Sequence, residues 1–94
     1  MRLMTETEVK SLPALYQTED TVADEKVVLI RFYELNSGWQ WFLCEYSSED
    51  QIAFGYVMGH ENEWGYFSLE EMEGIHTILR DKKFQPMMFK DLKR

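Results

Sequence analysis

Hydrophobic and polar residues alternate most clearly between residues 27 and 34. Val28, Ile30 and Phe32 would line one face of a strand there, and the residues between them would line the other face. The Asn-Ser-Gly sequence at 36–38 follows at a spacing that suits a hairpin turn. The pattern therefore predicts a first strand that leads directly into a second one.

Three further strands are predicted downstream, separated by short polar turns. The strands span residues 39–46, 51–58 and 64–67, and the turns between them span residues 47–50 and 59–62. Because each connection is short, strands that follow one another along the chain should pair in antiparallel fashion. The expected sheet is a four-stranded antiparallel meander.

Two capping boxes predict helices on either side of this meander. The Thr-x-x-Glu sequence at 5–8 predicts a short N-terminal helix, which should end near Leu12 because Pro13 disfavours helix at the preceding residue. The Ser-x-x-Glu sequence at 68–71 predicts a second helix over residues 69–79. Its apolar side at helical spacing would consist of Leu69, Met72, Ile75, His76 and Leu79.

Length and composition fit one small globular domain. The chain has 94 residues, of which 45% are hydrophobic and 15% are aromatic, enough for a single core. No internal repeat or linker divides it, so residues 1–94 are expected to form one α+β domain. After Arg80 the chain is expected to be an irregular basic tail, in which Phe84 could lie in an edge strand that Pro86 ends and Phe89 and Leu92 could anchor a last turn.

The formal net charge of −7 is distributed unevenly along the chain. Residues 32–79 contain nine carboxylates and no Lys or Arg, whereas residues 80–94 contain six cationic and two acidic side chains. Phosphates would be repelled by the acidic stretch, so direct binding of duplex DNA is disfavoured there. Solubility alone explains many such charge runs. The functional alternative is a basic partner.

The cellular setting follows from the single cysteine and from hydropathy. Cys44 cannot form an internal disulfide, so the fold does not depend on an oxidising compartment. The first residues become polar before the apolar region of a signal peptide could form, and no apolar run approaches the ~20 residues that span a bilayer. We expect a cytoplasmic location and no membrane association.

Catalytic or metal-binding chemistry has little support in the sequence. The candidate ligands His60, His76 and Cys44 show no paired spacing, and Cys44 lies in a predicted strand among apolar residues. We therefore expect no enzyme activity, no cofactor and no metal. A small enzyme that uses His60 with Glu61 or Glu63 remains an alternative, and it would need an ordered pocket around His60.

The aromatic residues leave open whether both faces of the predicted sheet are covered by other segments of the chain. Residues 39–46 and 54–56 are apolar on both faces of their strands, whereas an antiparallel sheet with helices on one side only should have a polar outer face. Either the terminal segments wrap the second face, or some rings are exposed and mark an interaction surface.

Four segments carry a resemblance to a known family. They are Leu-Pro-Ala-Leu-Tyr at 12–16, Trp-Gln-Trp at 39–41, Phe-Gly-Tyr-Val-Met-Gly at 54–59 and Glu-Trp-Gly-Tyr-Phe-Ser-Leu at 63–69. Across nearly the whole chain the sequence resembles the domain-of-unknown-function family 2958, with Met72 where that family usually has Leu. Its members occur on plasmids, integrative elements, phages and bacterial chromosomes, and no activity is established for them. The resemblance implies a mobile-element accessory protein and supplies no catalytic residues.

These features favour a non-catalytic protein-binding module. Its acidic, aromatic surface would dock a basic host or plasmid protein that handles nucleic acid, and an anti-CRISPR-like inhibitor is one version of this hypothesis. The alternative is binding of single-stranded nucleic acid by the basic tail, with strand aromatics stacking on bases. The residues expected to contact the partner are Trp39, Trp41, Glu45, Glu49, Asp50, Glu61, Glu63 and Trp64.

Overall fold

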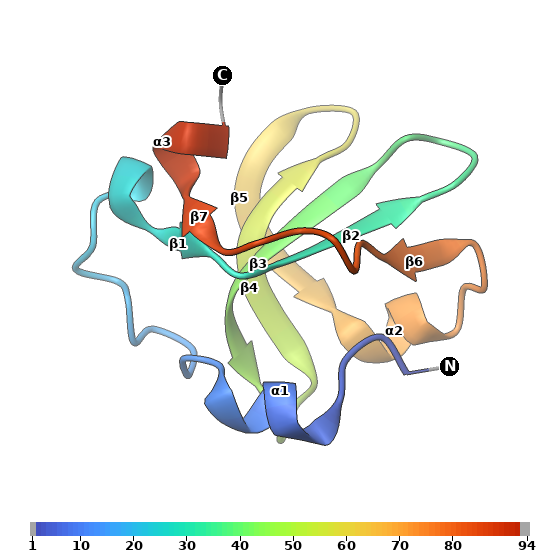
Figure 1. The fold of residues 1–94 in the computed structure, drawn as a ribbon, viewed down its shortest axis with the longest axis horizontal. Helices are drawn as coiled ribbons and strands as arrows, with labels where there is room; N and C mark the ends of the chain where they lie inside the picture. Colours follow the sequence, from blue (N-terminus) through green and yellow to red (C-terminus); the bar gives the residue numbers. More distant parts are fainter. Residues whose placement is uncertain (1, 93–94) are drawn as a thin grey trace.

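The structure, a computed structural model, describes residues 2–92 and has an α+β fold (Figure 1). Three short α-helices and one 3₁₀ turn accompany seven strands in this part of the chain. In chain order the elements are α1 (Glu6–Ser11), η1 (Ala23–Glu25), β1 (Val27–Val28), β2 (Ile30–Glu34), β3 (Gln40–Ser47), β4 (Ile52–Met58), β5 (Asn62–Ser68), α2 (Leu69–Glu73), β6 (Ile78–Arg80), β7 (Met87–Met88) and α3 (Phe89–Leu92).

The main sheet contains five antiparallel strands in the order β5-β4-β3-β2-β6. Strands β2 to β5 form the predicted meander, because each pairs with its neighbour along the chain. The prediction of four strands was wrong in number, since β6 adds to the outer edge of β2 and pairs Ile78 with Glu34 and Arg80 with Phe32. A separate ladder joins β1 to β7 near the C-terminus.

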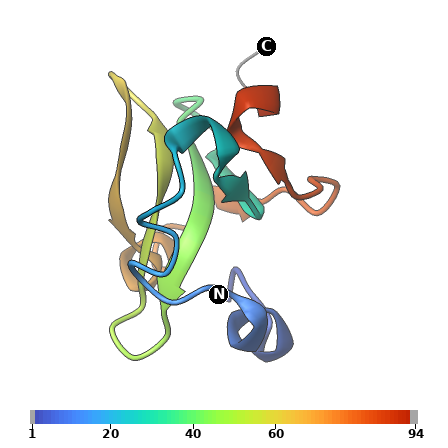
Figure 2. The ribbon, with the colours of Figure 1, turned by 90° about the vertical axis from the view of Figure 1, so that its left-hand side faces the viewer.

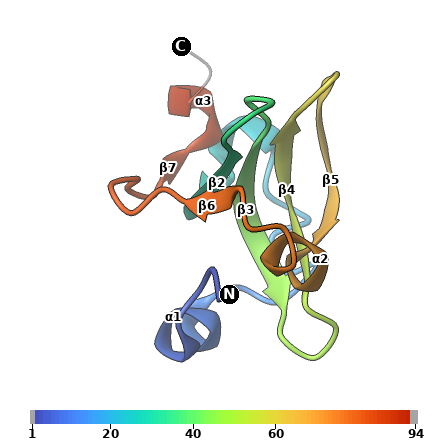
Figure 3. The same cartoon turned by 90° about the vertical axis from the view of Figure 1, so that its right-hand side faces the viewer.

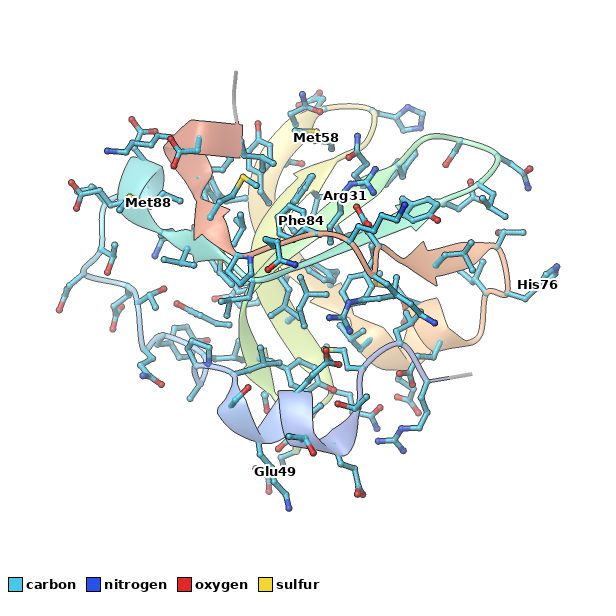
Figure 4. All side chains as sticks on the ribbon, viewed as in Figure 1. Arg31, Glu49, Met58, His76, Phe84 and Met88 are labelled. Carbon is cyan, nitrogen blue, oxygen red and sulfur yellow. The ribbon has the colours of Figure 1, made fainter. Side chains whose placement is uncertain are left out.

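The second helix is shorter than its sequence pattern predicted. It ends at Glu73, and the N–H of Gly74 closes its last turn on the carbonyls of Glu71 and Met72. The β-branched residues Thr77 and Ile78 favour extended backbone, and pairing with β2 buries Ile78. His76 is therefore an exposed turn residue and not part of an apolar helix face (Figure 4).

The first helix forms as predicted. The Glu8 N–H donates to Thr5 Oγ1 at 3.1 Å, and the Thr5 N–H donates to Glu8 Oε1 at 2.9 Å, which completes the capping box. Arg80 binds both carboxylate oxygens of Glu8 at 2.8 and 2.7 Å and holds the pKa of Glu8 at about 2. This ion pair fastens α1 to the edge strand β6.

One face of the sheet, here called the α2 face, packs against α2 and the N-terminal residues. Side chains on one face alternate along each strand with those on the other, and paired residues share a face. Figure 3 shows α2 and the N-terminal residues beside the lower parts of β3, β4 and β5. The buried cluster here contains Leu3, Met4, Ile30, Phe32, Leu43, Tyr46, Ala53, Phe67, Leu69, Met72 and Ile78.

The opposite face, here called the C-terminal face, packs against residues after β6. Val28, Phe42 and Cys44 form its buried cluster, and Phe84, Met87 and Leu92 pack on it from the C-terminal segment, which crosses the sheet in Figure 1. The expectation of an irregular tail was therefore wrong in part. Residues 82–86 are irregular, but β7 and α3 follow them, and Phe89 is buried.

Candidate functional site

Glu45, a predicted partner-binding residue, is a buried structural group. Its side chain is 3% exposed. Glu45 Oε1 accepts the Tyr16 N–H at 2.8 Å, and Oε2 accepts the Thr18 N–H at 3.0 Å together with the Thr18 hydroxyl. Lys26 Nζ donates to the Thr18 carbonyl at 2.5 Å and to Thr18 Oγ1 at 3.1 Å. The prediction that Glu45 contributes surface charge is therefore wrong.

A register shift in β3 places Glu45 in this position. Leu43 pairs with Gly55 and Glu45 pairs with Phe54, so Cys44 is an extra residue without a partner on β4. Such a bulge turns two successive side chains to the same side of the strand. Glu45 consequently joins Cys44 on the C-terminal face, beneath the loop 13–26 that runs along the sheet in Figure 2. We call Glu45, Tyr16, Thr18 and Lys26 the Glu45 clamp.

Glu49 and Asp50 lie far from the other predicted acidic residues. Both are exposed in the turn between β3 and β4, whereas Glu61 and Glu63 lie in or beside the turn between β4 and β5. The seven residues of β4 separate these turns by about 20 Å. Figure 4 labels Glu49 at one end of this hairpin and Met58 at the other end. A single acidic array that includes all four residues does not form.

Trp64 lies on a different face from the other two tryptophans. Its position in the register, opposite Tyr56 and Phe42, places it on the C-terminal face. Its ring centroid is 4.7 Å from that of Phe89 and 5.4 Å from that of Tyr56. Half-buried in this aromatic packing, Trp64 anchors the C-terminal segment and does not join Trp39 and Trp41.

The remaining four predicted residues do come together. The Trp39 and Trp41 ring centroids are 6.0 Å apart, and the His60 ring meets Trp39 edge-on at 5.5 Å. Trp41 pairs with Val57, and Val57 pairs with Glu63 across the sheet. We call this group the tryptophan surface; it consists of Trp39, Trp41, Val57, His60, Glu61 and Glu63.

The tight turn between β4 and β5 positions this surface. A Cβ at Gly59 would lie 2.6 Å from the Trp39 ring, so glycine allows the ring to pack directly on the backbone. The Gly59 N–H donates to the Glu61 carbonyl at 3.1 Å and closes the turn. The carboxylates of Glu61 and Glu63 are thereby carried by the same hairpin that supports the indole of Trp39.

The tryptophan surface lies on the uncovered part of the α2 face. Trp39 and Trp41 are half-buried, while His60, Glu61 and Glu63 are exposed. In Figure 3 no ribbon lies over the upper parts of β4 and β5. Arg80 is two strands from Trp41 on the same face, but its guanidinium is bonded to Glu8. The carboxylates of this surface are therefore not neutralised by that arginine.

The cationic residues of the C-terminal segment lie elsewhere. Arg31, on the C-terminal face, donates to Asp81 Oδ2 at 2.9 Å, while Lys82, Lys83 and Lys90 are exposed. Phe84, Met87 and Leu92 of this segment pack on the C-terminal face, opposite Trp39 and Trp41, while Lys82 lines a groove beside residues 2–8 and β6. The other two cationic residues of the predicted basic tail, Lys93 and Arg94, lie outside the described residues.

The groups considered for catalysis are not assembled into a site. His60 is exposed, and burial raises the pKa of the Cys44 thiol to about 12, which opposes formation of a nucleophilic thiolate. Within residues 2–92 no three His, Cys, Asp or Glu side chains are grouped so that they could hold a metal ion. A groove of about 1120 Å³ lies between residues 2–8 and β6, and His60 does not line it.

Two exposed tyrosines, Tyr16 and Tyr66, were not predicted as partner-binding residues, and the expectation that Tyr16 docks on the core was wrong. Tyr16 and Tyr66 are 60% and 54% exposed, and the Tyr66 ring centroid is 5.1 Å from that of Phe54. A hydrogen bond with Tyr16 raises the pKa of Tyr66. Tyr16 has a φ of 71°, a left-handed conformation that the Glu45 clamp supports by accepting its N–H. The alternation of residues in β5 predicts which face of the sheet Tyr66 occupies. Its contact with Tyr16 could not be predicted from the sequence, because this contact depends on the path of the loop 13–26.

Comparison with known proteins gives no information on the function of this chain. No helix within residues 2–92 has the length and apolar character needed to cross a membrane. Searches of protein-family models, of curated proteins and of solved structures found no match to this chain. The resemblance to the domain-of-unknown-function family 2958 stays a prediction.

Proposed function

We propose that this chain is a non-catalytic module that binds a basic surface of a partner protein through the tryptophan surface. The observation that carries the proposal is the placement of two partly buried indole rings beside Glu61 and Glu63 on an uncovered part of the sheet. Tryptophans supply large apolar contact area, and flanking carboxylates select a cationic partner. Trp39 and Trp41 act as the anchors of the contact, and the two glutamates form its rim.

The partner that fits this chemistry is a protein whose own ligand is nucleic acid. A phosphate-binding surface presents Lys and Arg side chains, which would meet the carboxylates of Glu61 and Glu63. Residues 32–79 contain no cationic side chain that would repel such a surface. In this proposal the chain competes with nucleic acid for the partner, and an inhibitor of a host defence nuclease, as in an anti-CRISPR protein, is one version of that role.

Two matched charge reversals test the proposal. Glu61→Lys with Glu63→Lys alters the tryptophan surface, and Glu49→Lys with Asp50→Lys makes the same change of charge at the opposite end of β4. The wild-type protein and both variants are immobilised, and proteins captured from bacterial lysate are identified by mass spectrometry. We expect the wild type and the 49/50 variant to capture the same nucleic-acid-binding protein, and the 61/63 variant to lose it.

Equal capture by both variants would contradict the proposal, because binding would then be independent of the tryptophan surface. Equal loss in both would show that total charge, and not this surface, governs the association. Circular dichroism and urea unfolding confirm that the variants are folded, which we expect because all four residues are exposed.

Binding of single-stranded nucleic acid is the alternative. It draws support from the exposed Lys82, Lys83 and Lys90, but Phe84, Met87 and Leu92 of the same segment pack on the face opposite the Trp39–Trp41 pair. A titration of tryptophan fluorescence with single-stranded oligonucleotides at two salt concentrations separates the two functions. Binding that weakens steeply with salt supports the alternative. An unchanged signal removes it.

A further inference from the structure

Strand β5 forms one border of the main sheet. It pairs with β4 along its whole length, and within residues 2–92 the strand order places no other strand on its second side. Figures 2 and 3 view the molecule from opposite sides, and in both of them β5 is the outermost strand with no ribbon beyond it. Its outer edge is therefore open to a further strand.

The hydrogen-bond pattern shows which backbone groups point outward. The Leu69 N–H donates to the Gln51 carbonyl, and the Gly59 N–H donates to the Glu61 carbonyl. Both bonds join directly opposed residues, and such pairs recur at every second position of an antiparallel ladder. The odd-numbered residues of β5 therefore bond to β4, while Trp64 and Tyr66 direct their N–H and C=O groups away from the sheet.

The edge lacks several of the features by which proteins usually block strand addition, although it carries the charged Glu63. Residues 62–68 contain no Pro, Lys or Arg, and the β4–β5 register runs without a bulge. A Cβ at Gly65 would meet nothing within 4 Å, so no group packs over the α2 face of the strand at its middle. The opposite border strand, β6, has only three residues. β5 is thus the longer and more regular of the two edges.

We propose that an extended cationic segment of the partner protein adds to β5 as a sixth, antiparallel strand of the main sheet. This inference rests on the proposed function, because β5 begins beside Glu61 and carries Glu63 of the tryptophan surface. Charge complementarity determines which kind of segment pairs with this edge. A second copy of this chain would bring another net charge of −7 to the same edge, whereas a cationic strand is complementary to it.

The geometry also specifies the side-chain pattern of the incoming segment. Its residues opposite Trp64 and Tyr66 form hydrogen-bonded pairs with them and project onto the C-terminal face, where an uncharged or apolar side chain suits the exposed Tyr66 ring. The residues that alternate with them project toward Glu63 and Glu61, where lysine or arginine suits the carboxylates. The partner segment is then recognised both by backbone hydrogen bonds to β5 and by its alternating cationic and uncharged side chains.

The first arm of the test uses the wild-type protein and three peptides. The unmodified probe is acetyl-Lys-Thr-Lys-Val-Lys-Thr-Lys-amide, and its two analogues carry N-methyl groups either on the Thr and Val amides or on the Lys amides. Only the Thr and Val amides face β5 in the proposed register. We expect methylation there to weaken binding about tenfold or more, measured by tryptophan fluorescence, and methylation of the Lys amides to change it by less than about twofold.

The second arm uses two protein variants that differ in one backbone group. Tyr66→Pro removes the outward N–H without removing a ladder bond to β4, and Tyr66→Val removes the same ring but keeps that N–H. We expect Tyr66→Val to bind the unmodified peptide and Tyr66→Pro to bind it about tenfold more weakly or worse. If Tyr66→Pro does not fold, the methylated peptides decide the question with the wild-type protein.

Three results would overturn strand addition. The first is absence of binding by the unmodified peptide. The second is equal binding of all three peptides; if binding is then weakened by Glu61→Lys with Glu63→Lys, docking through charge stands and only the strand geometry fails. The third is a dimer in analytical ultracentrifugation that Tyr66→Pro dissociates and Tyr66→Val preserves, because the edge is then occupied by a second copy.

Discussion

Glu45 and Glu63 lie in the same acidic stretch of sequence, but the structure gives them opposite roles. Glu45 is buried and fixes the loop 13–26 through the backbone N–H groups of Tyr16 and Thr18. Glu63 is exposed beside Trp41 and Val57 on the tryptophan surface. A carboxylate that accepts buried N–H groups stabilises the fold, whereas a solvated carboxylate is available to a partner. The comparison shows that a count of acidic residues does not measure surface charge.

Replacing the carboxylate of the Glu45 clamp should have the largest effect on stability. Glu45→Ala leaves the N–H groups of Tyr16 and Thr18 without their acceptor and removes the anion that faces Lys26 through Thr18. We expect the free energy of unfolding to fall by about 3 kcal/mol. Urea denaturation measures it, and Glu63→Ala is the matched control, with an expected change within about 0.5 kcal/mol. Equal changes in the two variants would contradict the division of roles.

The bulge that directs Glu45 inward depends on Gly55. A Cβ at this position would lie 1.9 Å from the Phe42 carbonyl oxygen, so β3 and β4 would have to separate. We expect Gly55→Ala to destabilise the protein by about 2 kcal/mol, as measured by thermal unfolding. Its cross-strand neighbour Gly65 has open space around a Cβ, and Gly65→Ala should change stability by less than about 0.5 kcal/mol. A large loss in Gly65→Ala would show that the α2 face of β5 is covered at this position.

A smaller effect should follow at the tryptophan surface. Gly59→Ala would place a methyl group 2.6 Å from the Trp39 ring and force the indole to tilt away. Because the ring is half-buried at a hairpin tip, it can move, and we expect a loss of about 1 kcal/mol. Iodide quenching of tryptophan fluorescence should rise as Trp39 becomes more accessible. Unchanged quenching would mean that Trp39 does not pack on this turn.

The ion pair between Glu8 and Arg80 should give the smallest effect and a defined pH dependence. The pKa of Glu8 is lowered to about 2 in the folded chain, so its contribution is present above the usual pKa and is lost as pH falls toward 2. Since both side chains are partly exposed, we expect Glu8→Gln to cost less than about 1 kcal/mol at pH 7 and only a small fraction of that at pH 2, where about half of Glu8 is protonated in the folded chain. Urea unfolding at both values measures this difference. A penalty that persists undiminished at pH 2 would point to the capping box.

Local sequence pattern was sufficient for the meander and its caps. Alternation marked β2 to β5 to within a few residues, and the Thr5 and Ser68 caps both formed, because strand and cap signals act within a few residues. The prediction of a helix over residues 69–79 was wrong in its second half, because α2 ends at Glu73. There, pairing of Ile78 with β2, more than 40 residues away in sequence, outweighed the helical spacing of the apolar side chains.

The sequence alone therefore determined the order of the strands in the meander, the two helix starts and the absence of cationic side chains between residues 32 and 79. Only the tertiary structure decided that Glu45 is buried and that Trp64 faces away from Trp39 and Trp41. Burial and proximity depend on contacts between segments distant in sequence, and one bulge in β3 changes which face a side chain occupies.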